Sequence, residues 1–188
     1  MIDASSSLID VAFAVSTALD RADISAVLTG GSAATFYAPA VYQSGDADFV
    51  LRFYEDGPAV APALAPLGFA FQGGSFRHPR TAYIVEFPRG PLKIGDDDVR
   101  THATYPRGDE VLHILTSTDT IRDRLMNYFA WNDLSCLNAA AGVYERQRDS
   151  ADLSAIEAWV ARESNGPFAR DYDRKFRIFL ELIGRNRT

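Results

Sequence analysis

The pattern of apolar and polar positions predicts helices and strands in alternation over the first part of the chain. Residues 5–21 carry an apolar stripe with helical spacing, and the serines at the start of this range can cap a helix. The stripe consists of Leu8, Val11, Ala12, Val15 and Leu19. Residues 24–28 form a short apolar run, which predicts a buried strand that ends at a Gly-Gly turn. After the turn we expect a short helix over residues 32–37, which ends before Pro39.

The middle of the chain predicts further strands, and the remainder predicts only helices. We expect strands over residues 46–53, 69–71, 81–87 and 111–115, and a short or irregular helix over residues 59–67. Helical stripes follow over residues 118–132, 133–147, 152–163 and 172–183. Trp131 and Trp159 fit these stripes, so we predict that both indole rings lie in the core. The expected fold is α+β: a small mixed sheet flanked by helices in residues 1–116, with a helical region in residues 117–188 packed on it.

Composition and charge restrict the class of protein. The chain has 188 residues, of which 47% are hydrophobic, and this suits one domain with a helical appendage. Acidic residues outnumber basic ones by 25 to 19, so a broad basic surface for nucleic acid is not expected. Basic residues do gather near the C-terminus, where they form either a solvated helix face or a local basic groove. They are Arg170, Arg174, Lys175, Arg177, Arg185 and Arg187.

Cysteine content and the absence of long apolar runs indicate the compartment. Cys136 is the single cysteine, so the chain can form neither an internal disulfide nor a cysteine-rich metal site, and we interpret it as a small core residue. No apolar run approaches the roughly 20 residues that span a bilayer, and the N-terminus lacks the basic start of a signal peptide. We therefore expect a cytoplasmic protein without a membrane partner.

Three acidic residues on predicted strands are the main candidates for chemistry. Asp46 and Asp48 are two apart on one strand, so their side chains project to the same face. Glu86 closes another, mostly apolar strand, where a charge costs free energy unless it is paired, exposed or bound to a metal. If the two strands are neighbours, the three carboxylates meet, and Mg²⁺ relieves their repulsion while it binds substrate phosphates. The Gly-Gly turn at Gly30 and Gly31 can present backbone N–H groups to those phosphates.

Each of these features also has a simpler interpretation. An Asp-x-Asp pair is common in turns and at exposed strand ends, and a Gly-Gly pair can form a plain tight turn. Three consecutive aspartates, Asp96, Asp97 and Asp98, resemble a cation loop only in charge, and we interpret them as a solvated turn. The three histidines show no metal-ligand spacing, so we assign them no chemical role.

The combination of these motifs resembles the nucleotidyltransferase superfamily of the DNA polymerase β type. The shared pattern is a hydrophobic strand, a Gly-Gly or Gly-Ser turn, a short helix, an Asp-x-Asp pair and a third acid on a later strand. In this chain the pattern reads Val27-Leu28-Thr29-Gly30-Gly31-Ser32, Asp46-Ala47-Asp48 and Glu86. The Gly-Gly-Ser-Ala-Ala run, with Ser44 two residues before Asp46, is most similar to minimal bacterial nucleotidyltransferases, which include AbiEii-type toxins of toxin–antitoxin systems. Many relatives carry Arg four residues before the first Asp, where this chain has Tyr42.

The resemblance implies a role for each of these residues. Asp46 and Asp48 would bind Mg²⁺ and the triphosphate, and Glu86 would complete the metal site and help to deprotonate the acceptor hydroxyl. The nucleotide would be held by Gly30, Gly31, Ser32 and Ser44. The cationic candidates are Lys93, Arg122 and Arg124. Because Arg122 and Arg124 lie on different faces of the predicted helix, we expect at most one of them to face the site, and we favour Arg124.

The implied function is Mg²⁺-dependent transfer of a nucleoside monophosphate from a nucleoside triphosphate, such as ATP, to an acceptor. The acceptor can be RNA, a protein or a small molecule, and a toxin of this kind would have an antitoxin protein as its partner. One alternative is a catalytically inactive nucleotide-binding or regulatory module of the same fold, against which the three intact acids argue. A second alternative is a structural domain in which the acids are incidental.

Overall fold

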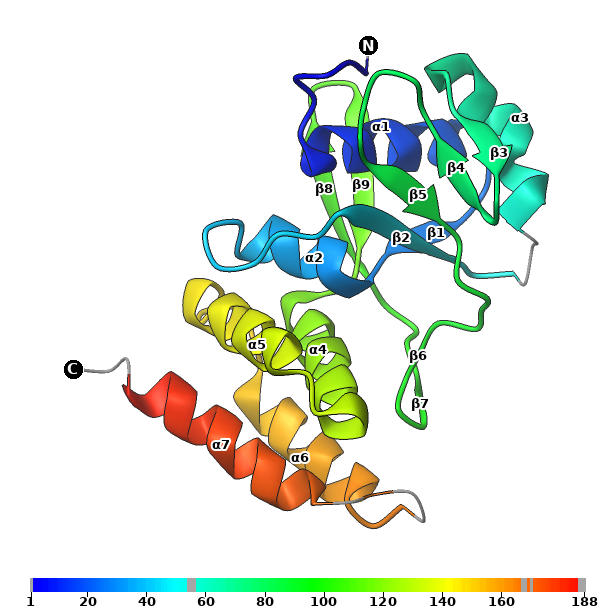
Figure 1. Cartoon of the computed structure of the whole chain (residues 1–188). Coiled ribbons are helices and arrows are strands. Elements are labelled where there is room, and N and C mark those ends of the chain that lie inside the picture. Colours follow the sequence, from blue (N-terminus) through cyan, green and yellow to red (C-terminus); the bar gives the residue numbers. More distant parts are fainter. Residues whose placement is uncertain (1, 54–56, 167–168, 170, 186–188) are drawn as a thin grey trace.

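The computed structural model describes residues 2–53, 57–166, 169 and 171–185 (Figure 1). A mixed sheet of seven strands occupies the N-terminal part of this described chain, in the order β3-β4-β5-β2-β1-β9-β8. Its strands are β1 (Ala26–Leu28), β2 (Asp46–Leu51), β3 (Ala70–Gln72), β4 (Ser75–Arg77), β5 (Ile84–Glu86), β8 (Ala103–Arg107) and β9 (Glu110–Ile114). A separate hairpin is formed by β6 (Lys93–Ile94) and β7 (Asp97–Asp98). The expected α+β fold with a small mixed sheet is confirmed.

The helices lie around this sheet and at one end of it. They are α1 (Leu8–Arg21), α2 (Gly30–Tyr37), α3 (Ala61–Leu64), α4 (Ser117–Trp131), α5 (Leu134–Arg146), α6 (Leu153–Glu163) and α7 (Tyr172–Arg185), with short 3₁₀ segments at Gly57–Val60 and Ala65–Leu67. Figure 1 shows α4 to α7 gathered on one side, with α2 between them and the sheet. α2 contacts β2 as well as α4 and α5, so it connects the helical group to the strands. Among the described residues, no helix has both the length and the apolar character needed to cross a bilayer.

Helix α1 is capped as its sequence predicts, and it packs on the sheet through the predicted apolar stripe. Ser7 caps it: the Ser7 hydroxyl accepts a hydrogen bond from the Asp10 N–H, and the Asp10 carboxylate accepts one from the Ser7 N–H, at 2.9 Å. The five apolar residues of the predicted stripe are all buried. Along the same helix, Thr17 exchanges hydrogen bonds with the backbone of Val111, and the Ser16 hydroxyl accepts one from the His113 N–H. These bonds fix α1 across β9.

Several predicted boundaries differ from the structure. The predicted strand over residues 81–87 shortens to Ile84–Glu86, and the helix expected from residue 32 begins at Gly30. The sequence analysis missed β4, the β6–β7 hairpin and β8. β8 is an edge strand whose residues are half-buried or exposed, and it contains Pro106, which an edge strand tolerates. Such a strand lacks the alternation on which the predictions relied.

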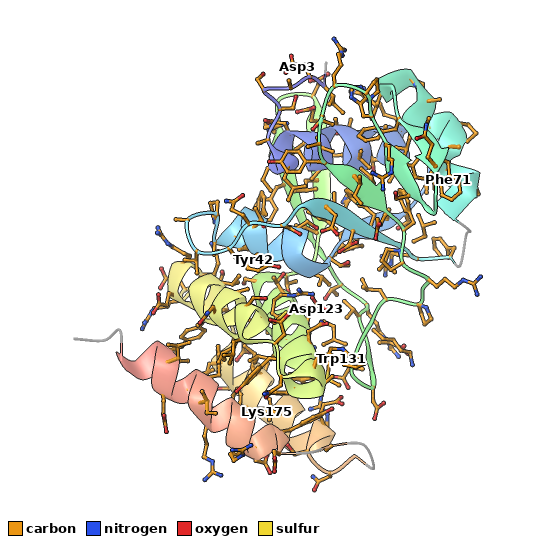
Figure 2. All side chains as sticks on the ribbon, in the orientation of Figure 1. Asp3, Tyr42, Phe71, Asp123, Trp131 and Lys175 are labelled. Carbon is orange, nitrogen blue, oxygen red and sulfur yellow. The ribbon has the colours of Figure 1, made fainter. Side chains whose placement is uncertain are left out.

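The prediction that both tryptophans lie in the core is right for Trp159 and wrong for Trp131. Trp159 is fully buried, stacks against Phe129 with ring centroids 6.2 Å apart, and donates a hydrogen bond to Glu163 Oε1 at 3.1 Å. Trp131 is 79% exposed. It is the last residue of α4, and Asn132 ends that helix in the left-handed conformation. Figure 2 shows Trp131 at the end of α4 that lies away from the sheet.

Substitution of these two tryptophans should have unequal effects on stability. We expect Trp159→Ala to lower the free energy of unfolding by about 3–5 kcal/mol, because it removes a large buried ring. Trp131→Ala should change it by no more than about 0.5 kcal/mol, because the ring is already in solvent. Urea denaturation followed by circular dichroism measures both values. Equal losses would contradict the packing described for α4 and α6.

Candidate active site

The parallel pairing of β2 with β5 brings the three predicted acids together. Its register places Asp46 beside Ile84 and Asp48 beside Glu86, so the two acidic strand segments share one face. One carboxylate oxygen from each of Asp46, Asp48 and Glu86 lies within 4.8 Å of the other two, and all three residues are half-buried. The meeting that the sequence analysis made conditional on neighbouring strands is therefore found in the structure.

The turn between β1 and α2 is fastened to the middle of β2. The Thr29 N–H donates to the Asp48 carbonyl oxygen at 2.8 Å. The Ser32 hydroxyl donates to the Thr29 carbonyl oxygen at 2.8 Å and accepts from the Asp48 N–H at 3.3 Å. Ser32 is fully buried, so its hydroxyl serves the turn rather than the surface. The first helical hydrogen bond is Ala33 N–H to Thr29 C=O, which leaves the N–H groups of Gly30, Gly31 and Ser32 without a helical acceptor.

Gly30 allows a carboxylate to lie directly on this turn. Its φ is +66°, and a Cβ built there would lie 2.7 Å from Asp48 Oδ2. A Cβ on Gly31 would lie 2.9 Å from Ser44 Oγ and 3.1 Å from the Tyr42 hydroxyl. Both positions therefore need glycine, the first for its conformation and its contact and the second for its contact. The result is a turn whose backbone is in close contact with the acidic cluster.

Ser44 orients one of the acids. Its hydroxyl donates to Asp46 Oδ1 at 2.7 Å, and its N–H donates to Thr35 Oγ1 at 2.9 Å. The Thr35 hydroxyl in turn donates to the Gly31 carbonyl oxygen at 3.0 Å. This chain of bonds links the Asp46 carboxylate to α2. The sequence analysis did not identify Thr35, although its position one helical turn after Gly31 is a signal that could have found it.

The electrostatics of the cluster favour a bound cation. Burial, followed by the charges of Asp46 and Glu86, raises the pKa of Asp48 to about 6, while Arg124 opposes the shift. Three oxygen donors that repel one another, in a half-buried place, match the ligand preference of Mg²⁺. The residues present thus fit a hard divalent cation.

Of the three cationic candidates, Arg124 is the one whose charge lowers the pKa of Asp48. It extends from α4, its side chain is only 11% exposed, and its charge acts on the pKa of Asp48. Its Nε and one terminal nitrogen donate to Asp123 Oδ2 at 3.0 and 2.7 Å, and the other terminal nitrogen contacts Cys136 Sγ at 3.6 Å. Asp123, labelled on α4 in Figure 2, was not among the site residues predicted from the sequence, although it precedes Arg124 directly. It holds the guanidinium in place.

The other two cations have partners elsewhere. Arg122 pairs with Asp119 and Asp97, and its guanidinium lies over the Trp159 ring at 4.9 Å. Lys93 pairs with Asp98 within the β6–β7 hairpin at 3.3 Å. Arg122 therefore ties the hairpin to α4, and Lys93 lies on that hairpin, where no contact between described residues joins it to the three acids. The expectation that Arg122 and Arg124 face different ways agrees with their contacts.

The charge of Asp48 should make the metal-free protein less stable as the pH rises. Because the pKa of Asp48 is raised from 3.8 to about 6, the folded state retains a proton that the unfolded state releases, and stability falls between about pH 4 and pH 6. In EDTA at pH 8 we expect Asp48→Asn to be more stable than the wild type by about 3 kcal/mol, and the difference to vanish below about pH 4.

Urea denaturation across this pH range measures the effect, and Asp109→Asn is the control, since the Asp109 side chain is 92% exposed. Saturating Mg²⁺ should reverse the order at pH 8, because only the wild type retains all three ligands. A metal-free Asp48→Asn protein that is less stable than the wild type at pH 8 would contradict this account.

Gly30→Ala should lower the free energy of unfolding more than alanine at another glycine of the same backbone conformation. Gly108 has a φ of +61°, but a Cβ there meets nothing within 4 Å. We expect Gly108→Ala to cost about 1 kcal/mol through backbone strain alone. Gly30→Ala should cost about 2–4 kcal/mol, since the added methyl group also displaces Asp48, and it should abolish the stabilisation by Mg²⁺. Thermal denaturation with and without Mg²⁺ tests both; equal losses would show that Asp48 does not depend on Gly30.

Comparison with known proteins shows which solved structures have a similar fold. The sequence matches no protein-family model and no curated protein. The fold is similar to the crystal structure of an antigenic nucleotidyltransferase-like protein from Paracoccidioides brasiliensis, with a TM-score of 0.56 and 15% identity over 86% of this chain and 90% of that chain. It is also similar to the solution structure of the antibiotic-resistance factor ANT(2'')-Ia, with a TM-score of 0.51 and 11% identity over 84% of this chain and 91% of that chain. The chain therefore has a nucleotidyltransferase-like fold.

Proposed function

We propose that this protein is an enzyme that transfers a nucleoside monophosphate from a nucleoside triphosphate to an acceptor, with Mg²⁺ as cofactor. The observation that carries the proposal is the convergence of Asp46, Asp48 and Glu86 beside the turn at Gly30 and Gly31. A site with anionic ligands for a cation next to backbone N–H groups that have no helical acceptor suits a metal-bound phosphate chain. The likeness of the fold to nucleotidyltransferase-like proteins supports the same conclusion.

The three carboxylates would hold the metal ion, and the chemistry that Mg²⁺ supplies there is neutralisation of the triphosphate and of the leaving pyrophosphate. Groups of the protein itself orient the metal ligands and the phosphates and accept the proton. Ser44 fixes the orientation of Asp46 through its hydroxyl, and the N–H groups of Gly30 and Gly31 would orient the phosphates. The acceptor oxygen attacks the α-phosphorus, the bond from that phosphorus to the bridging oxygen breaks, and pyrophosphate leaves. Glu86 accepts the proton of the acceptor hydroxyl.

Arg124 adds positive charge from the helical side of the site. Negative charge builds up on the phosphate oxygens during transfer, and a pre-positioned guanidinium stabilises it without reorganisation. Asp123 holds Arg124 by two hydrogen bonds, so the side chain does not have to be ordered when substrate binds. In this proposal the strands supply the metal ligands, and α4 supplies the cation.

The biological role in the proposal is that of a cytoplasmic toxin with an antitoxin partner. It is supported by the resemblance of the Gly-Gly-Ser-Ala-Ala run and Ser44 to minimal bacterial nucleotidyltransferases. A gene for the antidote beside the gene for this protein, and relief of growth arrest when both are expressed, would support it. Growth unaffected by expression of the protein alone would contradict it.

Nucleotide binding and transfer should both require the acidic cluster. We expect Mg²⁺ with a nucleoside triphosphate at about 100 times its Kd to raise the melting temperature by roughly 5–10 °C. With α-³²P-labelled ATP, GTP, CTP and UTP, and total cellular RNA and protein as acceptors, label should appear in one acceptor fraction. Asp46→Asn, Asp48→Asn and Glu86→Gln should each lower this transfer by at least about 100-fold.

Asp109→Asn removes the same charge from an exposed position and should leave transfer unchanged. Nucleotide binding that does not depend on Mg²⁺, without transfer, would instead indicate an inactive binding module. No response to any nucleotide would indicate a structural domain and would overturn the proposal.

A further inference from the structure

The side chain of Tyr42 lies against the turn between β1 and α2. A Cβ built on Gly31 would lie 3.1 Å from both the Tyr42 hydroxyl and the ring atom Cε1, so the hydroxyl end of the ring contacts the turn. The same Cβ would lie 2.9 Å from Ser44 Oγ, which donates to Asp46. Figure 2 shows Tyr42 beside α2. The Tyr42 hydroxyl is therefore next to the turn that the proposed function assigns to the phosphates.

The chain around Tyr42 is held between two helices. The N–H groups of Val41 and Tyr42 both donate to the Ala38 carbonyl oxygen, at 3.0 and 3.1 Å, so a turn follows α2. The Val41 side chain lies against α5, where a Cβ on Gly142 would be 2.6 Å from Val41 Cγ1. The Tyr42 ring is half-buried and packs against the core. Its position is thus fixed before a ligand binds, and little conformational entropy is lost when it forms a contact.

The Tyr42 hydroxyl differs from the other side-chain hydroxyls around this turn. Each of the others donates a hydrogen bond within the protein; they belong to Thr29, Ser32, Thr35 and Ser44. Within the part of the chain that the structure describes, no group accepts a hydrogen bond from the Tyr42 hydroxyl. Tyr37, five residues earlier, shows the ordinary case, because its buried hydroxyl donates to the Leu115 carbonyl oxygen at 2.8 Å. The Tyr42 hydroxyl is therefore available to a ligand.

The surroundings of Tyr42 keep this hydroxyl protonated. Burial raises the pKa of Tyr42, Arg124 opposes the shift, and three acidic groups add to it. The acidic groups are those of Cys136, Asp133 and Asp46. At neutral pH the side chain is therefore a phenol that donates a hydrogen bond. The same interactions show that Arg124, on α4, acts on Tyr42 as well as on the acidic cluster.

Packing does not explain the hydroxyl of Tyr42. Phenylalanine would fill the same volume without placing a polar atom in a half-buried position where no described residue accepts its hydrogen bond. A phosphate oxygen is a suitable acceptor, since hydrogen bonds to charged groups are stronger than those between neutral groups. The neighbouring N–H groups of Gly30 and Gly31 also have no helical acceptor. These donors lie on one turn and suit one anionic ligand.

We propose that the Tyr42 hydroxyl donates a hydrogen bond to the phosphate chain of the bound nucleotide, beside the N–H groups of Gly30 and Gly31. This inference deepens the proposed function, on which it rests for the identity of the ligand. Tyr42 contributes to binding rather than to the transfer step, because the phosphate chain is negatively charged both before and during transfer. Arg124 differs in this respect, since the proposed function assigns it to the charge that develops during transfer.

Isothermal titration calorimetry tests the proposal, with Mg²⁺ and either inorganic tripolyphosphate or each of the four nucleoside triphosphates as ligand. Tyr42→Phe removes only the hydroxyl oxygen and should raise the Kd of both kinds of ligand by the same factor, about 10- to 100-fold. In EDTA its melting temperature should stay within about 2 °C of the wild type. Transfer at saturating nucleotide should fall by less than about threefold.

Tyr105→Phe is the matched control. Tyr105 is a half-buried tyrosine on β8, which β1 and β9 separate from β2, and its ring packs on Phe36 with centroids 4.8 Å apart. The substitution removes the same oxygen atom far from the turn. It should leave the Kd of both ligands within about twofold of the wild type.

The possible results separate this inference from the proposed function. An unchanged Kd in Tyr42→Phe, when the wild type binds and transfers the nucleotide, would overturn the inference alone. So would a loss confined to the nucleotide, wild-type binding of nucleotide without tripolyphosphate, or weaker binding together with a lower melting temperature in EDTA. Wild-type protein that binds neither ligand would overturn both. Binding of both ligands that depends on Tyr42, without transfer to any acceptor, would contradict the proposed transfer and leave the phosphate contact standing.

Discussion

The register between β2 and β5 is the constraint on which the rest of the site depends. A shift of one residue would turn the acids of β2 to the opposite face and place Ala47 and Phe49 where they now lie. The observed register instead crowds three carboxylates into one half-buried place, and burial and repulsion hold the pKa of Asp48 well above its usual value. Folding therefore brings together carboxylates that repel one another, and a bound divalent cation would relieve this repulsion, which is the condition expected of a binding site rather than of a structural contact.

The surrounding hydrogen bonds hold this arrangement rigid. Thr29 and Ser32 bond to the backbone of Asp48, and Ser44 bonds to the carboxylate of Asp46. The turn and the Asp48 backbone are thus fixed to each other before any ligand binds. Little conformational entropy is therefore lost on binding. Arg124 is held in the same way from α4 by a neighbouring carboxylate, so the cation of the proposed site comes from the helical group.

Local periodicity explains what the sequence could predict. The shared face of Asp46 and Asp48 follows from a two-residue repeat within one strand, and the different directions of Arg122 and Arg124 follow from the helical repeat. Glu86 required the additional assumption that two distant strands pair, and the buried hydroxyl of Ser32 required knowledge of what packs on α2. Trp131 was misplaced because it is the last residue of α4, where its side chain is left in solvent. The catalytic roles and the division of the chain at residue 116 stay predictions.

The close contact between Gly30 and the Asp48 carboxylate limits how this position can change during evolution. Since the carboxylate of Asp48 fills the volume that any side chain would need, a descendant of this gene can change that glycine only after the acid has moved or disappeared. Loss of the glycine would therefore mark lineages that kept the fold and lost the arrangement of acids on which the proposed function depends. The codon at this position would then distinguish homologues that keep the proposed site from homologues that have lost it, even where sequence identity is too low to do so.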